Sequence, residues 1–184
     1  HEKDYEGLGG LKFGENLSTH FMKEIEFPFF RYYLEGKGRR PEPVYIYASG
    51  SDRWQTMQHW PSENAESRAL YLSAGRSLSF EAPSQDESSS TYHSDPSYPV
   101  PFMADATKRN NTYMVADQSF ASDRKDVLTF TSAVQNETFK LEGPVKVSLH
   151  LSISTDDADV VVKLIDVHPE GYQMLVRGDV FPVR

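Results

Sequence analysis

Residues 145–154 alternate apolar and polar side chains more regularly than any other part of the chain. Five apolar residues, beginning at Val145 and ending at Ile153, are interleaved with five polar ones. Since successive side chains of a β-strand point to opposite faces, this pattern predicts a strand with one buried and one solvated face. Such a strand requires neighbouring strands and an apolar layer against its buried face.

Further short runs rich in β-branched and aromatic residues are separated by Gly, Pro, Asn and Asp. They predict strands at residues 44–47, 69–73, 78–82, 127–132, 138–141, 160–167 and 172–176. Many short strands with turns between them favour a mainly β fold, a jelly-roll β-sandwich rather than a barrel. Residues 83–111 carry four prolines and few aliphatic residues, so we expect a long excursion over the sandwich surface.

One amphipathic helix is predicted over residues 15–34. Its apolar residues recur at four-residue spacing: Leu17, Phe21, Ile25 and Phe29. Asn16 or Ser18 could cap its start, and Gly36 stands where the helix should end. Pro28 should kink the helix or begin a second one. We expect the apolar stripe to pack on a core.

Charge and composition exclude several classes of protein. Nineteen basic residues against twenty-seven acidic ones give a net charge of −8, and no basic run exceeds Arg39-Arg40, which argues against binding to nucleic acid. No apolar run approaches the roughly 20 residues of a membrane-spanning helix, so no membrane partner is expected. The absence of cysteine removes disulfides, thiolate metal sites and cysteine nucleophiles.

Motifs for cofactors and metals are absent from the sequence. It contains no phosphate loop, no dinucleotide fingerprint and no H-E-x-x-H helix, so we expect no cofactor and no metal. Residues 75–79 approach the G-x-S-x-G turn of serine hydrolases but lack its last glycine, and Ser77 is therefore not expected to be a nucleophile. Residues 156–159 could offer carboxylates to Ca²⁺, although a solvated acidic turn is the simpler interpretation.

The remaining histidines and tryptophans have ordinary explanations. His20 and His150 are predicted to face solvent, and residues 166–168 to form a structural pair or an exposed tip. Trp54 and Trp60 are predicted to be packing anchors, although tryptophans on a β-sandwich can also stack on sugars.

The order of several sequence blocks, however, resembles one enzyme family. The blocks are residues 9–14, 29–34, 50–54, 60–61, 70–72, 92–96, 99–102, 117–120, 124–130, 162–167 and 171–173. Together they resemble the bacterial α-amino acid ester hydrolases, which belong with cocaine esterase, glutaryl 7-aminocephalosporanic acid acylase and the X-Pro dipeptidyl peptidases. The likeness covers nearly the whole chain, and its colinearity makes it more specific than any single block.

The resemblance implies an enzyme of three parts: an α/β-hydrolase domain with a Ser-His-Asp triad, a helical cap and a C-terminal jelly roll. Residues 1–40 would be the end of the hydrolase domain and residues 41–184 a jelly roll that lacks its last strands. The nucleophile, the triad aspartate and the cap would lie upstream. His1 stands twelve residues before Phe13, about where the family has its triad histidine. A tag remnant or a slightly different alignment remain alternatives for His1.

The expected activity is cleavage of a small ester or amide, an α-amino acid ester or a β-lactam-type acyl compound, through an acyl-enzyme. The chain itself would be mainly architectural, with the remaining segments of the same enzyme as partners and room for contacts in a homo-oligomer. Relatives suggest a periplasmic or secreted location. The alternative is a free-standing β-sandwich module that binds carbohydrate through Trp54, Trp60 and tyrosines.

Overall fold

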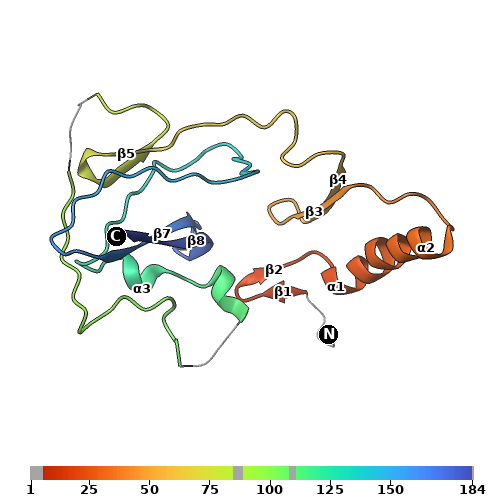
Figure 1. Cartoon of the computed structure of the whole chain (residues 1–184), viewed down its shortest axis with the longest axis horizontal. Coiled ribbons are helices and arrows are strands. Elements are labelled where there is room, and N and C mark those ends of the chain that lie inside the picture. The colour runs from red at the N-terminus through yellow and green to blue at the C-terminus, as the bar shows by residue number, and fades with distance from the viewer. Residues whose placement is uncertain (1–5, 85–88, 108–110, 184) are drawn as a thin grey trace. The chain divides into compact units, whose positions relative to one another are not determined.

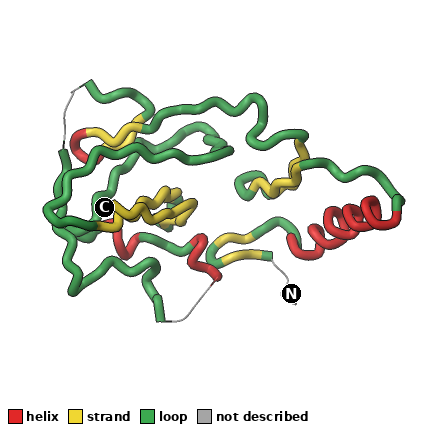
Figure 2. The backbone as a smooth tube through the Cα atoms, in the orientation of Figure 1, coloured by secondary structure: helices red, strands yellow, loops and turns green. Residues whose placement is uncertain are grey.

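The chain forms two separate units of structure (Figure 1). A computed structural model describes residues 6–84, 89–107 and 111–183. Unit 1 consists of His1–Ala65 with Glu142–Val145, and unit 2 consists of Glu66–Leu141 with Lys146–Arg184. Loops make up most of unit 2, and every sheet in the described ranges is a two-stranded antiparallel pair (Figure 2). The expectation of a mainly β chain with little helix is confirmed at this level.

Unit 1 begins with a small hairpin and a continuous helical segment. Strand β1 (Gly7–Leu8) pairs with β2 (Leu11–Lys12). The helical segment follows as α1 (Leu17–His20), a π-helical stretch η1 (Phe21–Glu26) and α2 (Phe27–Glu35). The helix predicted for residues 15–34 is therefore confirmed.

The ends of this helical segment follow the expected local chemistry. The side-chain Oδ1 of Asn16 accepts a hydrogen bond from the Thr19 amide at 2.9 Å, so Asn16 is the cap. Pro28 is the second residue of α2, directly after the π-helical stretch, in line with the prediction that it marks a break or the start of a second helix. Gly36 ends the helix in a left-handed conformation with φ 67°, which an L side chain rarely adopts.

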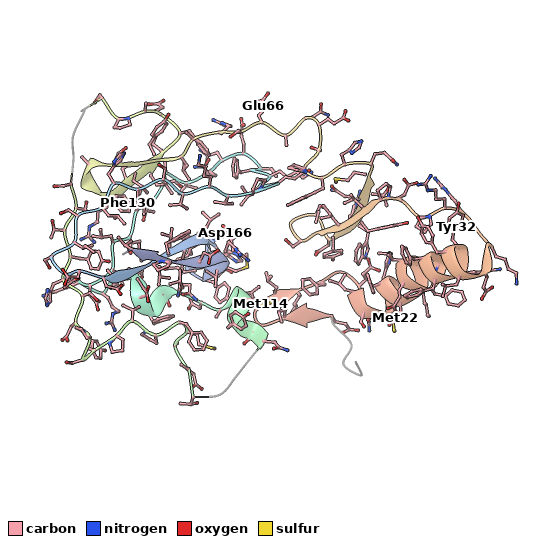
Figure 3. All side chains as sticks on the ribbon, viewed as in Figure 1. Met22, Tyr32, Glu66, Met114, Phe130 and Asp166 are labelled. Carbon is pink, nitrogen blue, oxygen red and sulfur yellow. The ribbon has the colours of Figure 1, made fainter. Side chains whose placement is uncertain are left out.

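The apolar stripe of the helical segment is not covered within unit 1. Phe27 is 63% exposed and Leu34 is 77% exposed, and no residue of α1, η1 or α2 is buried. Figure 3 shows the side chains projecting from this segment, with Met22 and Tyr32 labelled. The predicted packing on a core is thus absent from this structure, because helical spacing defines an apolar face without defining what covers it.

A second hairpin completes the regular structure described in unit 1. Strand β3 (Val44–Ala48) pairs antiparallel with β4 (Arg53–Met57), as predicted for residues 44–47. Tyr47 and Trp54 are direct partners in this register, near the turn that joins the strands. Asp52 adopts φ 49° in that turn, a conformation that Asp tolerates better than most residues.

Unit 2 contains two further hairpins. Strand β5 (Tyr71–Ser73) pairs with β6 (Ser77–Ser79) through the 3₁₀ turn η2 (Ala74–Arg76). The long strands β7 (Ala158–Val167) and β8 (Gln173–Val183) form the largest pairing, with a register shift between Leu164 and Ile165. The strands predicted at residues 160–167 and 172–176 are confirmed and extend further than expected.

Two short helices and a small buried centre accompany these hairpins. The helices are η3 (Asn111–Val115) and α3 (Ser119–Ser122). Within the described ranges, the buried side chains are those of Met103 and Gln118, at 7% and 1% exposure. None of the helices described is long and apolar enough to cross a membrane.

Three predicted strands are not part of any sheet in this structure. Residues 127–132 contact β6 only through a single bridge from Thr131 to Ser77, and residues 138–141 and 145–154 have no strand partner among the residues described. Two-residue periodicity indicates which face a strand would bury, whereas a strand exists only when a neighbour accepts its hydrogen bonds. The complete jelly roll and the domain boundary at residue 40 stay predictions.

Candidate functional site

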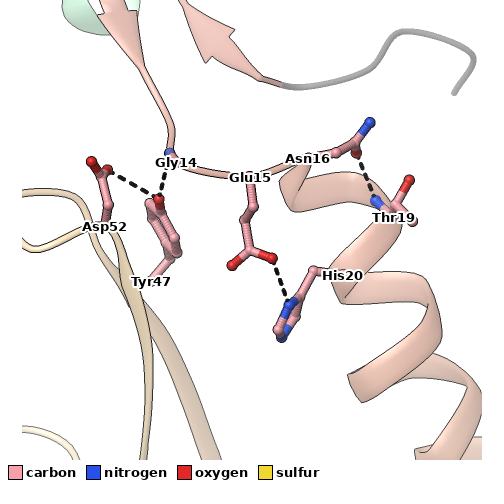
Figure 4. A network of polar contacts seen from close by, with 7 residues as sticks. All are labelled: Gly14, Glu15, Asn16, Thr19, His20, Tyr47 and Asp52. Atoms are coloured by element: carbon pink, nitrogen blue, oxygen red, sulfur yellow. Dashed lines mark hydrogen bonds and ion pairs between the residues drawn. The ribbon is translucent and has the colours of Figure 1, made fainter.

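The predicted catalytic residue His1 lies outside the described residues, so its role stays a prediction. The best-defined group of interacting polar and aromatic side chains in unit 1 is drawn in Figure 4, and Trp54 adjoins it. We call this group the polar cluster; it consists of Glu15, His20, Tyr47, Asp52 and Trp54.

Tyr47 joins the hairpin to the segment before the helix. Its hydroxyl donates to Oδ1 of Asp52 at 3.0 Å and accepts the Gly14 amide at 3.3 Å (Figure 4). Burial, and then the hydrogen bond to the Asp52 carboxylate, raise the pKa of Tyr47 above 10.0, its ordinary value. The phenol therefore remains a protonated donor through neutral pH.

His20 contacts both its own segment and the hairpin. Its Nδ1 lies 2.8 Å from Oε2 of Glu15, and its ring stacks on Trp54 with centroids 5.0 Å apart and planes inclined by 12°. The prediction that His20 faces solvent is wrong, because its side chain is only 28% exposed. Helical periodicity could not reveal this, since Glu15 precedes the helix and Trp54 comes from β4.

The polar cluster has part of the chemistry of a catalytic triad. A carboxylate that orients an imidazole is the arrangement of a general base, but a nucleophile must reach the second ring nitrogen. In the part of the chain that the structure describes, no hydroxyl donates to His20. Trp54 packs against both His20 and Tyr47, as predicted for an anchor, and its buried Nε1 has no hydrogen-bond partner there. The polar cluster therefore connects the start of the helical segment (α1) to the β3–β4 hairpin.

A second polar group forms in unit 2 around Lys163 of β7. Its Nζ lies 2.6 Å from Oε1 of Gln118 and 3.2 Å from the carbonyl oxygen of Phe102, and 5.8 Å from the ring centre of Phe120. Burial lowers the pKa of Lys163. Gln118 also donates from Nε2 to the carbonyl of Ala116 at 3.0 Å, so its buried amide is used at both ends.

Asp117 attaches the same segment to β8. It accepts hydrogen bonds from the amide and hydroxyl of Ser119, at 3.0 and 2.8 Å, and from the Gln173 amide at 3.1 Å. Burial opposes ionisation of Asp117, yet these hydrogen bonds outweigh it and hold its pKa below the ordinary value. Two of the family-like blocks, residues 117–120 and 162–167, thus meet as structural supports.

The other candidates from the sequence have no catalytic partner in the described residues. Ser77 is an exposed residue of β6. The acidic turn predicted for residues 156–159 ends at Asp157, because Ala158 and Asp159 already belong to β7, and all three aspartates are exposed. His168 lies 3.6 Å from Asp166 and 3.4 Å from Glu170 at the β7–β8 turn, as predicted for a structural pair. No three His, Asp or Glu side chains of the described chain are placed to hold a metal ion.

This chain is similar to known proteins in both sequence and fold. Residues 31–178 match the family model of the X-Pro dipeptidyl-peptidase C-terminal non-catalytic domain. Cocaine esterase of a Rhodococcus species is 31% identical over 137 residues. A solved structure of an α-amino acid ester hydrolase superposes with a TM-score of 0.82 at 32% identity over 97% of this chain. An aminopeptidase of a marine sediment Thaumarchaeota archaeon superposes with a TM-score of 0.78 at 27% identity over 98% of it.

The chain corresponds to a minor part of each of these relatives. It spans 24% of the cocaine esterase, 33% of the α-amino acid ester hydrolase and 32% of the aminopeptidase. The matched region of the cocaine esterase covers 70% of this chain.

Proposed function

Because this chain belongs to the family of X-Pro dipeptidyl-peptidase C-terminal non-catalytic domains, we propose that it is the supporting β domain of a serine hydrolase. The observation that carries the proposal is the likeness to an α-amino acid ester hydrolase over 97% of this chain. The substrate would be a small ester or amide, with an α-amino acid ester or a β-lactam-type acyl compound as the first choice.

The proposed reaction centre combines His1 with groups from the remaining segments of the same enzyme. A serine hydroxyl attacks the substrate carbonyl while His1 takes the hydroxyl proton, and His1 then returns that proton to the leaving alcohol or amine. Water hydrolyses the resulting acyl-enzyme by the same route, and backbone amides stabilise the oxyanion. The location stays proposed as periplasmic or secreted.

Within that enzyme, the described residues act as a frame. Hydrogen bonds join Gly14 to the β3–β4 hairpin through Tyr47. The Lys163–Gln118 contact holds the segment around α3 on the long β7–β8 hairpin.

The proposal is tested on the enzyme that carries this chain, with a fluorophosphonate probe and an ester substrate. The probe should label the enzyme and leave the 184-residue chain alone unlabelled. His1→Ala should reduce turnover by about 10³-fold or more while the melting temperature is unchanged. His20→Gln is the matched control, since His20 belongs to the polar cluster, and it should retain turnover. Full activity of His1→Ala, or labelling of the chain alone, would contradict the proposal.

A further inference from the structure

A shallow, open cavity of about 390 Å³ lies in unit 2. Two segments form it, residues 93–98 from the long excursion and residues 124–126 after α3. The side chains that line it are those of His93, Asp95, Tyr98, Arg124, Lys125 and Asp126. None of them takes part in the polar cluster or in the Lys163 contacts described above.

One of the lining side chains, Tyr98, lies against the ion pair between Arg124 and Asp126. Arg124 binds Asp126 with Nε at 2.8 Å and with Nη2 at the other carboxylate oxygen, and Nη2 also donates to the carbonyl oxygen of Tyr98 at 2.9 Å. The guanidinium lies 4.4 Å from the centre of the Tyr98 ring. Arg124 and Asp126 are themselves only 15% and 17% exposed. The ring is therefore backed by a fixed, neutralised pair.

Most of the Tyr98 side chain is exposed. Tyr98 is 68% exposed although its ring has the guanidinium against it. Asp95 orients the turn by accepting the Ser97 amide on Oδ1 at 2.8 Å, which leaves its second oxygen without a protein donor in the described chain. His93 and Lys125 have no hydrogen-bond partner among the residues described. The cavity thus presents an aromatic face together with free donors and a free acceptor.

The charges around the cavity cancel. Arg124 is matched by Asp126, and the lining carries one further base, Lys125, and one further acid, Asp95. A phosphate or carboxylate ligand would meet Asp95 as well as Lys125, which removes the advantage of an anion. A purely apolar ligand would leave these polar groups without hydrogen bonds. A neutral ligand with many hydroxyl groups and one apolar face fits both requirements.

We propose that this cavity binds a neutral saccharide, with the C–H face of a pyranose ring stacked on Tyr98 and its hydroxyl groups bonded to Asp95, Lys125 and His93. The backing by Arg124 orders the platform before the ligand arrives, so little conformational entropy is lost on binding. This proposal rests on the cavity alone, and the outcome of the His1→Ala experiment does not affect it.

The experiment uses the full 184-residue chain with two probes, maltotriose and methyl β-D-galactopyranoside. Saturation-transfer NMR should show contact with at least one of them, and calorimetric titration should give its affinity. Tyr98→Ala should weaken binding about tenfold, because the stacking face is lost, whereas Tyr98→Phe should stay within about twofold. Lys125→Met should also weaken binding, and because that side chain has no partner in the described chain, its loss should leave the fold intact.

Three outcomes would overturn the proposal. One is the absence of saturation transfer to both saccharides in the folded chain. Another is saccharide binding that Tyr98→Ala and Lys125→Met leave unchanged. The third is binding of inorganic phosphate that Lys125→Met abolishes while neither saccharide competes, which would identify an anion site instead.

Discussion

At the scale of single residues, the polar cluster shows how a few side chains set the local geometry of unit 1. Tyr47 is bonded on one side to Asp52 and on the other to the Gly14 amide. The same residue packs edge-on against Trp54, with ring centroids 5.5 Å apart. The protonation state of one phenol therefore bears on the attachment of the hairpin to the segment before the helix.

Tyr47 provides a prediction about alkaline pH. The pKa of Tyr47 is raised in the folded chain above 10.0, its ordinary value, so folded protein holds this proton more tightly than unfolded protein does. The stabilisation by Tyr47 is thus fully present below pH 10 and is lost as the pH rises through the folded pKa. Melting temperatures of the wild type and Tyr47→Phe should differ at pH 8 and converge above pH 10.

Asp52→Asn supplies the second arm of this test. This substitution replaces the charged acceptor of the Tyr47 hydroxyl with a neutral amide oxygen, and both the hydrogen bond to the carboxylate and its negative charge raise the pKa of Tyr47. Ionisation of Tyr47, followed by NMR of ring-labelled tyrosine, should therefore move to lower pH in Asp52→Asn. An unchanged titration in this variant would show that Asp52 does not control the phenol.

At the scale of elements, the helix ends and several individual strands were predictable from the sequence, whereas the partners of those strands were not. Asn16 and Gly36 act within a few residues of their own positions, so local chemistry was enough to identify them. The contact of His20 with Trp54 and that of Lys163 with Gln118 join residues far apart in sequence. No periodicity encodes such pairs, and only the assembled structure reveals them.

The contact between Lys163 and Gln118 should be strongly coupled. Gln118→Leu leaves the ammonium with the Phe102 carbonyl as its described acceptor, and we expect a loss of about 2 kcal/mol in the free energy of unfolding. Adding Lys163→Met to the Gln118→Leu variant also removes the ammonium group, which donates to the side-chain oxygen of Gln118 in the wild type. The double variant should lose about 1 kcal/mol less than the sum of the single variants, as measured by urea unfolding. Simple additivity would show that the contact contributes nothing.

The close contact between Gly143 and Pro61 within unit 1 leads to a prediction about the free energy of unfolding. An added Cβ at Gly143 would lie 2.8 Å from Cγ of Pro61, and the residue has φ 95°. Gly38 is a matched control, because its φ is 91° and nothing lies within 4 Å of its added Cβ. Gly38→Ala should cost about 1–2 kcal/mol from backbone strain, and Gly143→Ala clearly more because Pro61 must also move. Equal losses in denaturant unfolding would refute a close contact.

At the scale of the whole chain, the family could be predicted from the sequence, and the sheet arrangement only in part. The order of blocks such as residues 117–120 and 162–167 indicated the family, which the family match then confirmed. Strand β7 was foreseen from its dense β-branched residues, whereas only the first residues of β8 fell within a predicted strand, at residues 172–176. Residues 145–154 have the clearest alternation of all, yet they have no strand partner in the described chain.

That unpaired segment leads to the last prediction, which concerns association of the chain in solution. Its apolar row remains 37–51% exposed at Val145, Val147, Leu149, Leu151 and Ile153. A regular, exposed β-type segment with unpaired backbone groups is a template for pairing with another copy. We therefore expect the purified chain to self-associate as its concentration rises, measured by sedimentation velocity.

Lysine substitutions on one face or the other of residues 145–154 distinguish strand pairing between copies from nonspecific association. Leu149→Lys with Leu151→Lys puts two charges on the apolar face and should shift the chain towards monomer, because pairing would bury them. Ser148→Lys with Ser152→Lys adds the same charge to the polar face and should suppress association much less. If both pairs of substitutions had equal effects, net charge alone would govern association, and the alternation that dominates this sequence would have no role in it.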